Sequence, residues 1–332
     1  MTRRGWGLAA GALVAATLAA CSASSAGTTP TTTPTVTAPG TSSAPAPASS
    51  TGVVTATFPP APGAPKHQFY VSIGDSYAAG YQPTASRKGH TTRNGFAYQA
   101  VTLARAKGYD YTLVNFACAG ATTSSVLTRP GCPPELLGPG AASYAPRTQV
   151  GAAEAFLAAH RGQVGLVTVS IGGNDVTRCG LAADPVSCLT GALRTVSTNL
   201  RTLLTGLRQA AGAQTRIVGI TYPDVLLGNA LSKDPTLQST AKLSAFAFQA
   251  LINPALDSAY TAAGGRFVDV TAATGAYGSM TARTTLPPYG SIPVPVARIC
   301  TLTFYCQFQD IHPRTPGYGL IARLVTGTLP HH

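Results

Sequence analysis

Four short polar segments of this chain contain residue types that could carry out acyl transfer. Ser76 ends a Gly-Asp-Ser sequence, Gly120 ends Cys-Ala-Gly, Asn174 lies in Gly-Gly-Asn-Asp, and His312 lies in Asp-Ile-His-Pro. An imidazole can accept the proton of a serine hydroxyl as that hydroxyl attacks a carbonyl group. A glycine N–H and an asparagine amide can donate hydrogen bonds to the oxyanion that forms. The segments therefore predict a nucleophile, a base and an oxyanion hole.

The elements that must position these segments are strands and helices in alternation. The apolar runs of strand length are residues 69–73, 111–116, 166–171, 215–220 and 266–270. The stretches with helical periodicity are residues 96–107, 149–160, 192–211, 238–262 and 318–325. This alternation predicts an α/β fold in which helices cover both faces of a five-stranded parallel sheet. Loops at the carboxyl ends of its strands would bring the polar segments to one rim.

From about residue 69 to about residue 325, the order and spacing of these segments resemble the SGNH hydrolases, also called the GDSL family of lipases and esterases. The resemblance implies a three-layer, flavodoxin-like fold with strand order 2-1-3-4-5. It also implies cleavage of carboxylic esters through an acyl-enzyme, without a metal or an organic cofactor. The nucleophile elbow Gly-x-Ser-x-Gly is absent, because Ser76 stands in Gly-Asp-Ser-Tyr-Ala. This absence argues against an ordinary α/β-hydrolase.

Each candidate residue has a structural alternative. Ser76 could cap a helix instead of attacking the substrate. Gly120 could form an ordinary turn, Asn174 could form an Asx-turn, and His312 could be a surface histidine. Because all four occur together, we expect Ser76 to be the nucleophile and His312 the base. The oxyanion hole would consist of the Ser76 and Gly120 N–H groups and the Asn174 side chain.

The third member of the triad is open. In the family that the chain resembles, the acid lies three residues before the histidine, and here that position is Gln309. Asp310 lies only two residues before His312. Either the loop adapts so that the Asp310 carboxylate reaches the ring, or a backbone carbonyl near Gln309 orients it. We favour Asp310, since a carboxylate stabilises the imidazolium formed during attack. Asp75 and Asp175 are expected to order loops.

The seven cysteines fit an exported protein. Six of them allow fifteen pairings, which sequence alone does not resolve. Metal binding is the alternative use, but no Cys-x-x-Cys pair occurs. The family resemblance implies three local disulfides, namely Cys118–Cys132, Cys179–Cys188 and Cys300–Cys306.

The N-terminal region is typical of an exported, anchored protein. Residues 1–20 carry two arginines followed by an apolar stretch that is too short to span a bilayer, which indicates a signal peptide. The sequence Leu-Ala-Ala-Cys ending at Cys21 resembles a bacterial lipobox, which implies lipidation of Cys21 and a cell-envelope location. The alternative is a plain cleavage site and a secreted protein. Residues 21–65, rich in Ser, Thr, Ala and Pro, are expected to form a disordered tether before a domain at 66–332.

The net charge of +12 bears on partners. The lysines and arginines are scattered and form no run of four, so a nucleic-acid surface is not indicated. The charge could instead attract anionic envelope polymers or lipid headgroups, or simply belong to a soluble basic protein. We expect a monomer that acts on small-molecule or lipid esters.

Three functions fit this sequence. The favoured one is a lipase or esterase, and a polysaccharide O-acetyl esterase is an alternative because one fold hosts both substrate classes. A non-catalytic envelope lipoprotein is the third, although intact candidate residues speak against it. Two long stretches, 127–147 and 274–299, are expected to be irregular. They could form substrate walls or flexible decoration.

Overall fold

The computed structural model describes residues 67–141, 143–177, 179 and 182–330. The predicted signal peptide (1–20), the predicted lipidation site Cys21 and the whole of the predicted tether (21–65) lie outside these residues. The described residues hold the predicted hydrolase domain.

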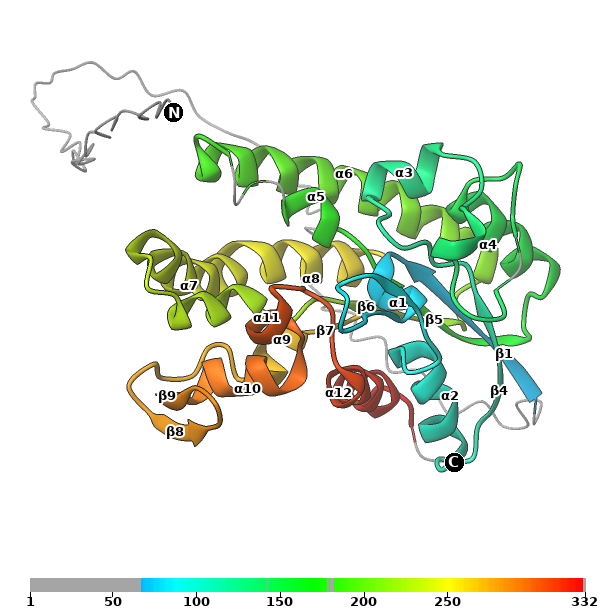
Figure 1. Ribbon diagram of the computed structural model, residues 1–332. Coiled ribbons are helices and arrows are strands. Elements are labelled where there is room, and N and C mark those ends of the chain that lie inside the picture. The colour runs from blue at the N-terminus through cyan, green and yellow to red at the C-terminus, as the bar shows by residue number, and fades with distance from the viewer. Residues whose placement is uncertain (1–66, 142, 178, 180–181, 331–332) are drawn as a thin grey trace, which may run out of the picture. The chain divides into compact units, whose positions relative to one another are not determined.

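The centre of this domain is a parallel sheet of five strands (Figure 1). Its order is β4-β1-β5-β6-β7, which confirms the order 2-1-3-4-5 among these strands. The strands are β1 (His67–Gly74), β4 (Asp110–Asn115), β5 (Val164–Ser170), β6 (Arg216–Ile220) and β7 (Arg266–Val268). Each pairs in parallel with its neighbour, as the alternation of strands and helices predicted.

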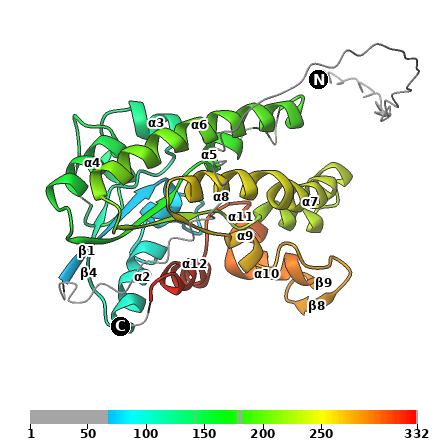
Figure 2. The ribbon, with the colours of Figure 1, turned by 180° about the vertical axis from the view of Figure 1, so that it is seen from behind.

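Helices cover both faces of the sheet, as Figures 1 and 2 show from opposite sides. On one face pack α4 (Gln149–Ala159), α6 (Pro185–Ala211) and α8 (Asn253–Ala262). On the other pack α2 (Phe96–Arg105) and α12 (Thr315–Gly327). The last five residues of β1 are buried, and Ser72 is the one polar residue between Phe69 and Gly74, as expected for a strand covered on both faces. The three-layer α/β/α fold is confirmed.

One predicted helix, 238–262, is divided in the structure. It consists of α7 (Pro235–Ala247), a π-helix (Phe248–Ile252) and α8 from Asn253. Pro254 stands in the first turn of α8. Proline has no N–H and its ring crowds the carbonyl four residues earlier, so the α-helical hydrogen-bond pattern is interrupted before it. The π-turn accommodates this break and leaves the apolar periodicity almost unchanged.

The stretch 274–299 is not irregular, contrary to the sequence prediction. It contains the hairpin of β8 (Arg283–Leu286) and β9 (Gly290–Pro293), followed by α10 (Val294–Leu302). A second hairpin joins β2 (Tyr81–Pro83) and β3 (Gly89–Thr91). Strands of three or four residues are too short to show a period of two. The remaining short elements are α1 (Ser76–Ala79), α3 (Thr123–Thr128), η1 (Pro134–Leu136), α5 (Gly173–Thr177), η3 (Val225–Leu231), α9 (Val270–Ala273) and α11 (Tyr305–Phe308).

Three disulfides close short loops, and they are the three local pairs that the family resemblance implied. They join Cys118 to Cys132, Cys179 to Cys188, and Cys300 to Cys306. Disulfides persist in oxidising compartments, so this arrangement is consistent with export. Within the described residues, no helix is both long and apolar enough to span a membrane.

A buried carboxyl group anchors α7 to the loop that follows β6. Asp224 is fully buried, and the Ser244 hydroxyl of α7 donates to its Oδ2 at 2.8 Å. Burial raises the pKa of Asp224 to about 7, although hydrogen bonds from Ser244 and from backbone N–H groups lower it in part. The folded protein therefore holds the Asp224 proton over a pH range in which the unfolded chain has lost it.

We predict that this proton makes folding stability fall as pH rises. The folded pKa lies above the ordinary value of 3.8, so stability from Asp224 is present at low pH and is lost as pH rises toward about 7. The slope for one such group is at most about 1.4 kcal/mol per pH unit. Urea unfolding across this range should give a flatter profile for Asp224→Asn than for the unaltered protein. The exposed Asp257→Asn is the control, and parallel profiles for Asp224→Asn would contradict the assignment.

Candidate active site

The turn between β1 and α1 is fixed by close backbone packing at Gly74. Its φ is 145°, and a Cβ there would collide with the carbonyl oxygen of Ser170 on β5. The side-chain amide of Gln149 bonds both backbone polar groups of Gly74: its Oε1 accepts from Gly74 N at 2.8 Å, and its Nε2 donates to Gly74 O at 3.0 Å. Only glycine fits this position, so the direction in which Ser76 leaves the strand is set.

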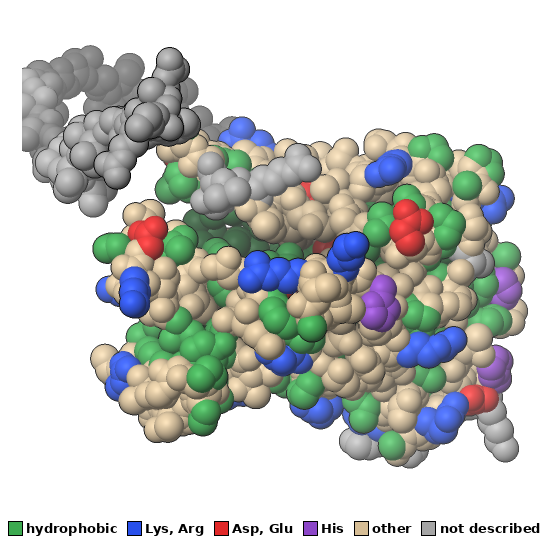
Figure 3. Space-filling model, in the orientation of Figure 1, with side chains coloured by type: hydrophobic (Ala, Val, Ile, Leu, Met, Phe, Trp, Pro, Cys, Tyr) green, Lys and Arg blue, Asp and Glu red, His purple; other side chains and the backbone are tan. Residues whose placement is uncertain are grey.

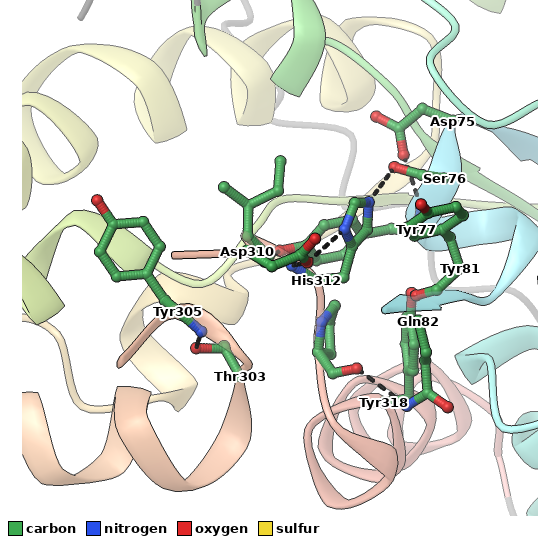
Figure 4. A network of polar contacts seen from close by, with 12 residues as sticks. Asp75, Ser76, Tyr77, Tyr81, Gln82, Thr303, Tyr305, Asp310, His312 and Tyr318 are labelled. Atoms are coloured by element: carbon green, nitrogen blue, oxygen red, sulfur yellow. Dashed lines mark hydrogen bonds and ion pairs between the residues drawn. The ribbon is translucent and has the colours of Figure 1, made fainter. Parts of the chain in front are cut away.

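Ser76, His312 and Asp310 form a chain of hydrogen bonds (Figure 4). His312 Nε2 lies 2.9 Å from Ser76 Oγ, and His312 Nδ1 lies 2.7 Å from Asp310 Oδ1. Ser76 is the first residue of α1, and Asp75 rather than Ser76 caps that helix. The serine hydroxyl is therefore available to the imidazole, and the helix-capping alternative does not hold.

Asp310 reaches the ring although it lies only two residues before His312. Gln309, at the end of α11, has a left-handed φ of 55°, which turns the chain sharply. Asp310 Oδ1 then accepts the His312 backbone N–H at 2.9 Å as well as bonding Nδ1, which is an Asx-turn. Partial burial opposes ionisation of Asp310, but the hydrogen bonds and charge of His312 outweigh it and lower the pKa of this carboxyl.

Residues next to Ser76 hold the histidine loop in place. The Tyr77 hydroxyl donates to the Ile311 carbonyl at 2.5 Å, directly before His312. Gln82 Nε2 donates to the Pro313 carbonyl at 3.1 Å, directly after it. The Tyr81 ring lies 4.5 Å from the imidazole, centroid to centroid. The β1–α1–β2 segment therefore holds His312 in place through bonds to the residue before it and the residue after it.

The loops that carry Gly120 and Asn174 are bonded to one another. Gly120 is exposed and has a positive φ of 82°. Ala121 follows it, and the Ala121 carbonyl accepts a hydrogen bond from Asn174 Nδ2 at 2.8 Å. Asp175 accepts from the backbone N–H and the hydroxyl of Thr123 at 2.9 and 2.6 Å. One N–H of the Asn174 amide is thus engaged, which orients the side chain and leaves its second N–H to donate elsewhere.

A further connection bonds the Gly120 loop to the serine turn, because Cys118 N donates to Gly74 O at 3.1 Å. The structure thus brings the serine, glycine and asparagine segments to one rim of the sheet, as the strand order requires.

Asp75 is a buried carboxyl directly before Ser76. Its Oδ1 accepts the Tyr77 N–H at 3.0 Å, and its Oδ2 accepts the Tyr222 hydroxyl at 2.6 Å. Burial raises the pKa of Asp75 to about 7, against the lowering effect of these two hydrogen bonds. The Tyr222 ring also packs so closely on Gly173 that a Cβ at Gly173 would lie 2.9 Å from it. Tyr222 therefore touches both the serine turn and the turn that precedes Asn174.

Metal-ligating side chains are not clustered in the part of the chain that the structure describes. No group of three or more His, Cys, Asp or Glu residues there could hold a metal ion.

Residues 72–320 match the family model of the GDSL-like lipase/acylhydrolase family. The chain belongs to this family. It is therefore a carboxylic ester hydrolase, and the family resemblance of its four polar segments is confirmed. Among curated proteins, none matches the chain significantly.

Several solved structures are similar to this chain. An extracellular lipase from Streptomyces rimosus has 18% identity and a TM-score of 0.41, with 77% of this chain and 99% of that chain covered. A catalytic mutant of an acetylxylan esterase from Geobacillus stearothermophilus has 16% identity and a TM-score of 0.45, with 79% and 95% covered. A carbohydrate acetylesterase family member from Sinorhizobium meliloti has 14% identity and a TM-score of 0.44, with 78% and 96% covered. Similarity at this level does not indicate which ester this chain cleaves.

The residues that position the site were not found from the sequence. Gln149, Tyr77, Gln82 and Tyr222 act on residues far away along the chain, through single side chains whose types are common on any helix or strand. The one usable signal was position, because Tyr77 directly follows Ser76 and Tyr222 lies two residues beyond β6.

We predict that Tyr222 positions the serine turn. Tyr222→Phe keeps the ring on Gly173 but leaves Asp75 Oδ2 without its donor, which costs about 1–3 kcal/mol of folding stability. The serine turn should then loosen, so that kcat falls about tenfold while KM changes little.

The matched control is Tyr98→Phe, which also removes a tyrosine hydrogen bond but lies on α2, where it donates to the Pro139 carbonyl. Steady-state kinetics and urea unfolding of both variants separate the two roles. A loss of stability with unchanged kcat in Tyr222→Phe would make Tyr222 structural only.

Proposed function

We propose that this protein hydrolyses carboxylic esters through an acyl-enzyme on Ser76. Ser76 Oγ attacks the ester carbonyl carbon while His312 Nε2 accepts its proton. The Asp310 carboxylate holds the Nδ1–H side of the ring and stabilises the imidazolium. His312 then protonates the leaving alcohol as the carbon–oxygen bond breaks. Water attacks the acyl-enzyme with the same proton transfers and releases the carboxylic acid and free Ser76.

The oxyanion of both tetrahedral intermediates would be held by three donors: the backbone N–H groups of Ser76 and Gly120, and the Asn174 side chain. The α1 helix has only four residues, so individual N–H groups rather than a helix dipole would supply this stabilisation. Support comes from the bond between Asn174 and Ala121, which keeps the asparagine beside the Gly120 loop.

The observation that carries the proposal is the imidazole of His312 between two partners. It lies 2.9 Å from Ser76 Oγ and 2.7 Å from Asp310 Oδ1, the distances that proton transfer to a general base requires. Both the histidine and the aspartate are largely buried, which strengthens the interaction between their charges.

We further propose that the enzyme acts outside the cytoplasm as a monomer held at the cell envelope. The sequence ending at Cys21 supports an acyl anchor, and residues 21–65 have the composition of a flexible tether. Mass spectrometry of the mature N-terminus reports whether Cys21 carries acyl chains.

We predict that Ser76→Ala lowers kcat for nitrophenyl esters by at least about a thousandfold, since no other group can form the acyl-enzyme. Circular dichroism and the thermal midpoint should stay near those of the unaltered protein, because alanine fits in place of this small buried side chain. The control is Ser258→Ala on the exposed side of α8. If Ser76→Ala retains more than about one per cent of kcat, Ser76 is not the nucleophile.

We predict that Asp310→Asn lowers kcat about a hundredfold or more. The amide oxygen can accept both hydrogen bonds that Oδ1 accepts now, so this variant removes the charge and keeps the loop. Without the negative charge the imidazolium is less stable, so the acid limb of the kcat/KM profile moves to lower pH. The exposed Asp257→Asn is the control. A loss below about tenfold with an unmoved acid limb would leave a serine–histidine dyad.

A further inference from the structure

The hairpin that follows α1 along the chain carries positive charge and no negative charge. It consists of β2 and β3, and its turn holds Arg87 and Lys88, both exposed. From residue 76 to residue 109 the sequence contains no Asp or Glu. Within the part of the chain that the structure describes, neither cation forms an ion pair, and Glu135 of η1, which packs on β3, forms none either. In Figure 3, Lys and Arg side chains lie along the middle of the face on which Figure 1 shows α1.

The turn of this hairpin uses an arginine where glycine would fit better. Thr84 N donates to Lys88 O at 2.7 Å and Arg87 N donates to Thr84 O at 2.9 Å, so residues 85–87 form a three-residue loop. The last residue of such a loop is left-handed and is usually glycine, but here it is Arg87, with φ of 61°. A Cβ in this conformation crowds the backbone and costs free energy. Among the described residues the Arg87 side chain bonds no other group, so the strain points to a role outside the turn.

One aromatic ring separates this hairpin from the imidazole of His312. The Tyr81 ring lies 4.5 Å from the imidazole, centroid to centroid, and Figure 4 shows the two side chains next to each other. The hydroxyl end of the same ring lies over Gly89, where a Cβ would come within 2.3 Å of Tyr81 Cζ. Lys88 directly precedes Gly89, so its Cα lies within roughly 14 Å of the imidazole. The bond from Gln82 to the Pro313 carbonyl keeps the hairpin against the histidine loop.

The position of the hairpin relates it to the alcohol part of an ester. In the proposed mechanism His312 protonates the leaving alcohol, so the alcohol oxygen must lie beside the imidazole. The hairpin contacts that imidazole through Tyr81. A substituent on the alcohol part can therefore extend over the Tyr81 ring to the turn. A guanidinium matches the paired oxygens of a carboxylate or a phosphate, and a neighbouring ammonium adds to the attraction.

We propose that Arg87 and Lys88, which together we name the basic turn, bind an anionic group on the alcohol part of the substrate. The substrate is then an ester whose alcohol carries a carboxylate or a phosphate. The inference rests on the proposed function of the site. It accounts for two observations at once: cations without a carboxylate partner one ring away from the base, and an arginine kept at a position that suits glycine.

The test compares two esters with the full protein, 4-butyryloxybenzoate and its methyl ester. They share the acyl group and differ in the negative charge on the alcohol part. Each kcat/KM is divided by the rate constant for hydrolysis of the same ester by hydroxide, which removes the difference in leaving-group reactivity. We expect a preference for the charged ester of about fivefold at low salt, because two exposed charge pairs are each weak. The preference should fall toward one at about 1 M salt, where the screening length is about 3 Å.

The basic turn itself is tested by Arg87→Gly combined with Lys88→Gln. Glycine adopts the left-handed conformation readily, so the thermal midpoint of this variant should not fall. The preference for the charged ester should drop about fivefold. The control is Arg105→Gln combined with Arg266→Gln, which removes the same net charge from exposed positions at the end of α2 and the start of β7, on the edge of the sheet away from the rim. It should keep the preference within about twofold.

Several results would overturn the inference while leaving ester hydrolysis intact. They are no preference for the charged ester, a preference that the basic-turn variant keeps, and an equal loss in the control variant. A loss seen only between 4-nitrophenyl hemisuccinate and 4-nitrophenyl butyrate would place the anion on the acyl part instead. Cleavage of nitrophenyl butyrate without cleavage of either benzoate would also contradict the inference alone. Failure to cleave any of these esters would overturn the proposed function and this inference together.

Discussion

The approach of two backbones at Gly74 is the constraint on which the rest of the site depends. Strand β1 ends so close to the Ser170 carbonyl of β5 that no side chain fits between them. The same contact lets Asp75 N bond the Ser170 carbonyl at 3.0 Å, and the Gln149 amide closes the other side. Because the turn cannot move along either strand, Ser76 leaves the sheet at a fixed place and in a fixed direction.

Side-chain hydrogen bonds then join the three loops of the rim to this turn and to one another. Tyr77 bonds the histidine loop, Tyr222 bonds Asp75 and covers the glycine before Asn174, and Asp175 bonds the loop after Gly120. Each of these bonds is partly buried, and a buried donor or acceptor left without its partner costs more free energy than the hydrogen bond itself contributes. The loops therefore hold one another in place, which would keep the proposed oxyanion donors positioned before a substrate binds.

The sequence predicted the candidate site residues and the buried strands, which residue types mark locally. It did not reveal the positioning residues, whose roles depend on tertiary contacts. A serine after a strand, a Gly-Gly-Asn-Asp turn and a late His-Pro mark their chemistry locally, and apolar runs mark the buried strands. Gln149 and Tyr222 carry no such mark, because their importance comes from residues far away in the chain. The break before Pro254 was missed because the apolar period continues across the π-turn. The role of Asp310 was left open because it depends on the left-handed backbone conformation of Gln309, which the residue type does not reveal.

The first part of α6 (residues 185–195) is stabilised by a cap and a disulfide as well as by partial packing on the core. Residues 185–195 hold no fully buried side chain, although Leu189 and Leu193 pack partly on the core, and a helical segment of that length is marginal in water by itself. Here it begins with the Asp184 side chain bonded to Ser187 N and with Pro185 in its first turn, and the Cys179–Cys188 disulfide ties it to the end of α5. These features keep the start of α6 helical beside α5, the helix that carries Asn174. Helix α5 therefore packs on a segment of α6 that a cap and a disulfide hold in place, and this limits the movement of the turn that carries Asn174.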